Sequence, residues 1–77
     1  MTQAIDIARR IGYKRIEASA LLAFGYQMFM KGKFQKALDF LENALSMFHG
    51  INDLRMTGVT YSTIGATEKT LDFTKRL

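Results

Sequence analysis

The stretch 31-KGKFQKALDFLENAL-45 places two small residues, Ala37 and Ala44, seven positions apart among larger apolar residues. A lone amphipathic helix needs an apolar stripe, but it does not need that stripe reduced to a methyl group at two points one heptad apart. We therefore expect other helices to approach this segment closely at the two alanines.

The apolar residues of this segment recur with the period of an α-helix. They are Ala37, Leu38, Leu41, Ala44, Leu45 and Phe48. The pattern predicts a helix over residues 34–48. Gly32 is expected to end the helix before it, and His49 and Gly50 to end this one, because glycine readily adopts the left-handed conformation that follows many helices.

Three further helices are predicted, over residues 3–11, 14–30 and 53–70. The first is expected to stop at Gly12, and the last to be capped by Asn52 or Asp53. The second has one apolar face, made of Ile16, Ala20, Leu21, Phe24 and Met28. A strand competes over residues 57–65, which are rich in β-branched side chains, but a lone strand would have no partner.

Glycines in the middle of two predicted helices need a structural reason. Gly25 and Gly65 each cost a helix about 1 kcal/mol relative to alanine. A close approach by a neighbouring helix would account for the missing side chain.

The chain also repeats itself with an offset of forty residues. The segment 4-AIDIARRIGYKRIEASALLAFG-25 matches 44-ALSMFHGINDLRMTGVTYSTIG-65 in the type and spacing of its apolar residues. The match pairs Ala4 with Ala44 and Gly25 with Gly65. The sequence therefore predicts an all-α chain built from helical hairpins joined by short turns.

This pattern resembles the tetratricopeptide repeat (TPR) family. The matching positions are Leu21, Phe24, Gly25, Gly32, Phe34, Ala37, Leu41, Ala44 and Leu45. The resemblance implies a single TPR-like domain over residues 1–77, a right-handed stack of antiparallel hairpins with about two repeats of a long, forty-residue type. It also implies that Ala37 packs near Gly25 and that Ala44 faces the next helix.

A stack of this kind normally needs at least three units. The chain is therefore expected to be a fragment of a longer array, or to form a homo-oligomer through its uncapped repeat ends.

The resemblance implies a function in protein–protein interaction. First helices of successive hairpins would line a groove for a peptide or helix, with Tyr26 and Phe29 as the best anchors. The implied groove residues are Ser19, Leu22, Tyr26, Phe29, Met30, Val59, Ser62, Ala66 and Lys69. The basic and Asn residues that clamp a carboxylate in the family are not matched, because Leu22, Tyr26 and Thr63 stand there. An apolar contact with the partner is expected instead.

Composition narrows the other possibilities. The chain has no cysteine and a single histidine, so no metal site, cofactor site or catalytic set is predicted, and an enzyme is not expected. No segment has the apolar length of a membrane span or a signal peptide, so a cytoplasmic protein without a membrane partner is expected.

A net charge of +4 keeps nucleic-acid binding open as the rival function, although the basic residues are scattered. A purely structural segment without a ligand is a further possibility.

Overall fold

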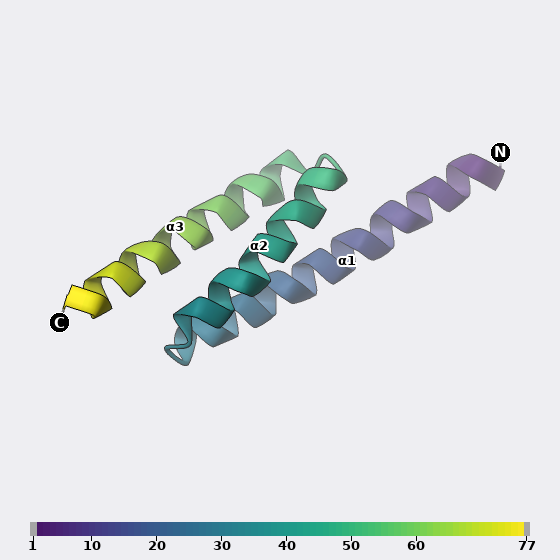
Figure 1. The fold of residues 1–77 in the computed structure, drawn as a ribbon. Helices are drawn as coiled ribbons and strands as arrows, with labels where there is room; N and C mark the ends of the chain where they lie inside the picture. Colours follow the sequence, from purple (N-terminus) through teal and green to yellow (C-terminus); the bar gives the residue numbers. More distant parts are fainter. Residues whose placement is uncertain (1, 77) are drawn as a thin grey trace.

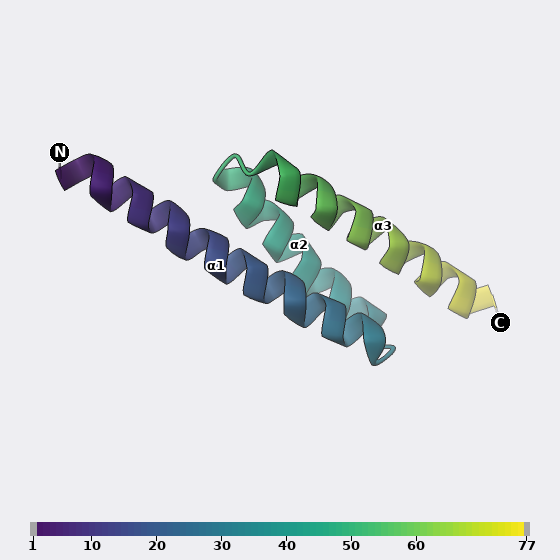
Figure 2. The same cartoon turned by 180° about the vertical axis from the view of Figure 1, so that it is seen from behind.

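Three helices joined by two short turns make up the computed structural model, which describes residues 2–76. Helix α1 spans Thr2–Met30, α2 spans Phe34–Gly50 and α3 spans Leu54–Arg76. Within residues 2–76 there is no strand, so the all-α prediction is confirmed. Figures 1 and 2 show α2 lying between α1 and α3, with consecutive helices running in opposite directions.

The predicted break at Gly12 is wrong. Helix α1 continues through Gly12, which joins the predicted helices 3–11 and 14–30 into one. The only glycine with a positive φ in the described residues is Gly32, so Gly12 does not take the left-handed conformation that would end a helix. A single helical glycine costs about 1 kcal/mol, and the flanking turns absorb that cost. The last two helices also run further than predicted, to Gly50 and Arg76.

The two turns close in the same way, although one is built on glycine and the other on asparagine. Gly32 has a φ of +78° and Asn52 a φ of +59°. In the first turn the amide of Lys33 donates to the carbonyl of Met28 at 2.9 Å, and in the second the amide of Asp53 donates to Phe48 at 3.0 Å. The left-handed residue thus satisfies carbonyls at the end of each helix. The prediction for Gly32 is confirmed, whereas Asn52 rather than Gly50 makes the second reversal.

Asp53 caps α3, as predicted. Its Oδ1 accepts a hydrogen bond from the amide of Met56 at 3.2 Å. Its Oδ2 accepts a second one from Nε of Arg15 on α1, also at 3.2 Å. One carboxylate therefore begins α3 and ties the α2–α3 turn to α1.

The core lies along α2. One cluster joins Ala44 and Phe48 of α2 to Ala18 of α1, and a second joins Leu38 and Leu41 to Ile64 of α3. The predicted apolar stripe of this helix is confirmed, since Ala37, Leu41, Ala44 and Phe48 are fully buried.

Gly25 is the point of closest approach between α1 and α2. A Cβ built on Gly25 would lie 2.8 Å from Cγ and Cδ2 of Leu41 and 3.3 Å from the carbonyl oxygen of Ala37. The expected packing of Ala37 near Gly25 is therefore confirmed. Ala44 instead lies against Ala18 of α1, with Met56 of α3 at the edge of the same cluster. Gly65, which was expected to mark a second close approach, has open space where a side chain would lie.

The predicted core face of α1 is partly wrong. Ile16 and Phe24 are 68% and 49% exposed, and Ala20 is exposed as well. Helix α1 carries two apolar stripes, and α2 packs on the one that contains Ala18 and Gly25. The small residues explain this choice, because they let the two helices approach more closely. Within residues 2–76, no helix packs over the stripe that contains Ile16, although Phe24 at one end of it contacts Phe40 of α2.

Threonines form most of the buried face of α3, beside Ile64. Thr57, Thr60 and Thr67 are buried, although their hydroxyl groups are polar. Six threonine hydroxyls of α3 donate to the carbonyl four residues earlier, at distances of 2.7–3.0 Å. Burial therefore leaves no hydroxyl without a partner, and the methyl groups remain available for packing.

The molecule is long and thin. Its Cα atoms extend over 58 Å by 19 Å by 12 Å. The N-terminal part of α1 projects past the α2–α3 turn, as both cartoons show. Within residues 2–76, no helix is both long enough and apolar enough to cross a bilayer.

Candidate functional site

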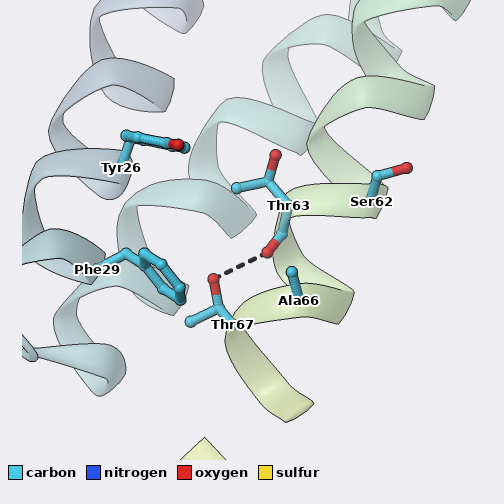
Figure 3. A pocket seen from close by; sticks show the side chains of 6 residues that line it. All are labelled: Tyr26, Phe29, Ser62, Thr63, Ala66 and Thr67. Carbon is cyan, nitrogen blue, oxygen red and sulfur yellow. Dashed lines mark hydrogen bonds between the residues drawn. The ribbon is translucent and has the colours of Figure 1, made fainter. Parts of the chain in front are cut away.

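A cleft of about 260 Å³ lies between α1 and α3 on one side of α2. Figure 3 shows its two walls, with Tyr26 and Phe29 from α1 facing Ser62, Thr63, Ala66 and Thr67 from α3. Helices α1 and α3 scarcely touch each other, because α2 holds them apart. The cleft is therefore a product of the three-helix arrangement.

Aromatic contacts order the α1 wall. The ring of Phe29 packs against Tyr26, with ring centroids 6.3 Å apart, and edge-on against Phe34 of α2 at 5.5 Å. Phe29 is half-buried, whereas Tyr26 is 57% exposed. Contacts on both sides fix Phe29 in place, while Tyr26 keeps an open ring face toward solvent.

The α3 wall is less polar than its sequence suggests. Thr67 donates to the carbonyl of Thr63 at 2.8 Å, the bond drawn in Figure 3, and Thr63 donates to Val59 at 3.0 Å. The hydroxyl hydrogens of both threonines are thus used inside α3. The wall presents mainly carbon atoms, among them the methyl group of Ala66.

Four of the nine predicted groove residues line this cleft: Tyr26, Phe29, Ser62 and Ala66. Leu22 lies deeper, where it packs against both core clusters. The other four lie outside the lining as exposed side chains: Ser19, Met30, Val59 and Lys69. The four lining residues thus lie in the middle of the expected groove, between Ser19 and Met30 on α1 and between Val59 and Lys69 on α3.

Two lining residues, Thr63 and Thr67, were not predicted to contact a partner. The helical spacing of the threonines was a usable signal. They recur at 57, 60, 63, 67, 70 and 74, which traces one face of a helix. Threonine has a low helix propensity, but local hydroxyl bonds make it acceptable on this face.

The cleft has no acidic side chain in its lining. No group of three or more His, Cys, Asp or Glu side chains that could hold a metal ion occurs in the described part of the chain. What the lining offers is shape, aromatic and methyl surface, and the hydroxyl groups of Tyr26 and Ser62. Comparison with protein-family models, curated proteins and solved structures finds no match to this chain.

Proposed function

We propose that the chain is a protein–protein interaction module that binds an amphipathic helix or peptide in the α1–α3 cleft. The observation that carries the proposal is the cleft itself, with an aromatic wall from α1 facing a methyl-lined wall from α3. We further propose that the three helices are one and a half hairpins of a TPR-like, right-handed stack. The helical hairpins, the close approach at Gly25 and the TPR-like residue pattern support this reading.

The chemistry of the cleft favours an apolar partner. Because Thr63 and Thr67 use their hydroxyl hydrogens within α3, they compete little for polar groups of a ligand. Each ligand methylene buried on the carbon surface gains about 0.8 kcal/mol. A helix that presents leucine-sized residues one turn apart fits a cleft between two helices.

The charge beside the cleft favours a partner with acidic groups. Lys69 is exposed one helical turn after Ala66, and no carboxylate lines the cleft. A partner carboxylate near Lys69 and the Tyr26 hydroxyl would find a cation and a hydrogen-bond donor. Such rim contacts add more to specificity and association rate than to affinity.

The test is a peptide-binding experiment mapped by NMR. A fluorescein-labelled amphipathic peptide with leucines at helical spacing and glutamates beside them is titrated with the full chain. Binding is expected to shift the ring and methyl resonances of Tyr26, Phe29 and Ala66. The variants Phe29→Ala, which removes an anchor, and Ala66→Leu, which fills the cleft, should each weaken binding about tenfold or more.

A matched control uses an aromatic residue away from the cleft. Phe73→Ala removes a ring that is 65% exposed and does not line the cleft, so it should leave peptide binding unchanged. Peptide binding that survives Ala66→Leu would contradict the proposal. A labelled single-stranded oligonucleotide tests the rival function, since binding that falls steeply with salt would indicate a nucleic-acid site.

A further inference from the structure

A second apolar surface runs along the outside of α1, away from the cleft and beside the face on which α2 packs. Its large residues are Ile5, Tyr13, Ile16 and Phe24, which are 53%, 68%, 68% and 49% exposed. They fall within about 100° of one another around the helix, a width typical of a buried helical stripe. At 1.5 Å per residue the stripe is about 28 Å long. We call these four residues the outer stripe.

The spacing of the outer stripe is the same in both directions. Successive members are eight, three and eight residues apart. If two such helices lie antiparallel, Ile5 of one meets Phe24 of the other, and Tyr13 meets Ile16. A surface that matches itself after a half-turn rotation is what a two-fold interface requires.

We propose that the outer stripe is a homodimer surface, on which α1 of a second copy of this chain docks antiparallel. The proposal does not depend on the α1–α3 cleft, because Tyr26 and Phe29 of the cleft lie on a different face of α1. A cleft without a ligand would leave the dimer unaffected, and a monomeric chain would leave the cleft unaffected.

Charges beside the outer stripe favour a second copy as its occupant. Arg10 and Glu17 lie on the same edge of the stripe and are both exposed. Within one helix they are seven residues, or about 10 Å, apart along the axis, which is too far for an ion pair. In the antiparallel dimer Arg10 of each copy comes beside Glu17 of the other, so symmetry gives two ion pairs.

The middle of the stripe also fits this arrangement. Arg9 lies between Ile5 and Tyr13, and the antiparallel register places it opposite Ala20 of the second copy. The small side chain of Ala20 leaves room for the aliphatic part of Arg9, whose guanidinium group can then reach water.

Helix α2 does not obstruct the second copy. It packs on the face of α1 that contains Ala18 and Gly25, beside rather than over the outer stripe. Phe40 of α2 lies next to Phe24, with ring centroids 5.8 Å apart, and so widens the apolar surface at that end. In this register residues 2–27 of the two α1 helices overlap over about 39 Å, and stable interfaces bury about 800 Å² on each partner.

Sedimentation equilibrium of the full chain, from about 1 μM to about 1 mM, tests the proposal. The expected result is a species of twice the 8.8 kDa monomer mass. Ile16→Ser, near the two-fold axis, should raise the dissociation constant about a hundredfold or more. Tyr61→Ser is the matched control, because Tyr61 is 60% exposed on α3 and should not affect dimerisation. A chain that stays monomeric, or a dimer unaffected by Ile16→Ser, would overturn the proposal.

Charge reversal distinguishes this interface from nonspecific association of apolar surfaces. Arg10→Glu and Glu17→Arg should each weaken the dimer about tenfold, because each replaces attraction with repulsion twice. The double variant should recover most of the lost affinity. No recovery would overturn the proposed register, and circular dichroism of each variant shows whether its helices remain intact.

Cysteine cross-linking tests the direction of pairing, since the natural chain has no cysteine. A mixture of Ile5→Cys and Phe24→Cys chains should form the mixed disulfide under mild oxidation. Each variant alone should cross-link poorly. Efficient cross-linking of Ile5→Cys to itself would indicate parallel helices and would overturn the antiparallel dimer.

Discussion

The two mid-helix glycines that the forty-residue repeat aligns should respond to alanine in opposite ways. Gly25 of α1 and Gly65 of α3 are equivalent in the repeat, but only Gly25 has a neighbouring helix against it. Alanine at Gly25 is expected to destabilise the chain, whereas alanine at Gly65 is expected to stabilise it. The pair therefore separates backbone preference from helix packing.

The magnitudes follow from the surroundings of each site. Alanine gains about 1 kcal/mol over glycine inside a helix. At Gly65 nothing lies within 4 Å of the new Cβ, so the full gain of about 1 kcal/mol is expected. At Gly25 the new Cβ would lie 2.8 Å from Leu41, which is fully buried and cannot move aside. Overpacking costs about 1–3 kcal/mol, so the net loss is about 1 kcal/mol.

Thermal unfolding followed by circular dichroism, at one protein concentration, measures both variants. For a domain of this size, 1 kcal/mol shifts the Tm by about 4–8 °C, so the two variants should differ by about 10 °C. Equal increases in Tm would refute the close approach at Gly25. Equal decreases would show that Gly65 also meets a neighbouring helix.

Three further tests address the core, the cap and the threonine face. Phe48→Ala should lower the free energy of unfolding by about 3–5 kcal/mol in a urea titration, because Phe48 is fully buried. Phe73→Ala, with a ring that is 65% exposed, should change it by less than about 0.5 kcal/mol. Asp53→Ala removes the cap hydrogen bond and the ion pair with α1, so a loss of about 1 kcal/mol is expected, and an unchanged Tm would contradict the capping role. In calorimetry, Thr67→Val should lower the free energy of unfolding less than Thr67→Ser, because valine keeps the buried methyl group and serine loses it, at a cost of about 0.8 kcal/mol. The reverse order would show that the hydroxyl hydrogen bond contributes more than the methyl group.

The sequence was most informative along α2. Six apolar residues at helical spacing located its buried face, and Gly32 located the turn before it, because a left-handed residue is needed there. The small residues were a good guide wherever both partners lie within the chain, as at Gly25 and Ala37. Four of the six residues that line the cleft were also predicted, because the TPR-like pattern implied these groove positions.

The local sequence pattern was insufficient where the same residues are compatible with two different structures. A glycine between helical segments can end a helix or continue it, and nothing in residues 9–15 distinguishes these outcomes for Gly12. Helix α1 carries two apolar stripes, and the sequence does not say which one α2 covers. Its choice depends on the close fit at Ala18 and Gly25, which involves residues far apart in the chain. The β-branched threonines of α3 left a strand as the competitor over residues 57–65, because the hydroxyl bonds that suit them to a helix form only within that helix.

The central position of α2 also affects how fast the chain folds and where it unfolds locally. Nearly all tertiary packing joins helices that are consecutive in sequence, an arrangement associated with folding in microseconds to milliseconds. Amide hydrogens in the middle of α2 should exchange with solvent most slowly, since both neighbouring helices must detach to expose them. Amides of residues 4–10, whose side chains are all exposed, should exchange fastest among those of α1 at low protein concentration. Raising the concentration until copies pair along the outer stripe should slow exchange in that same segment and leave α3 unchanged.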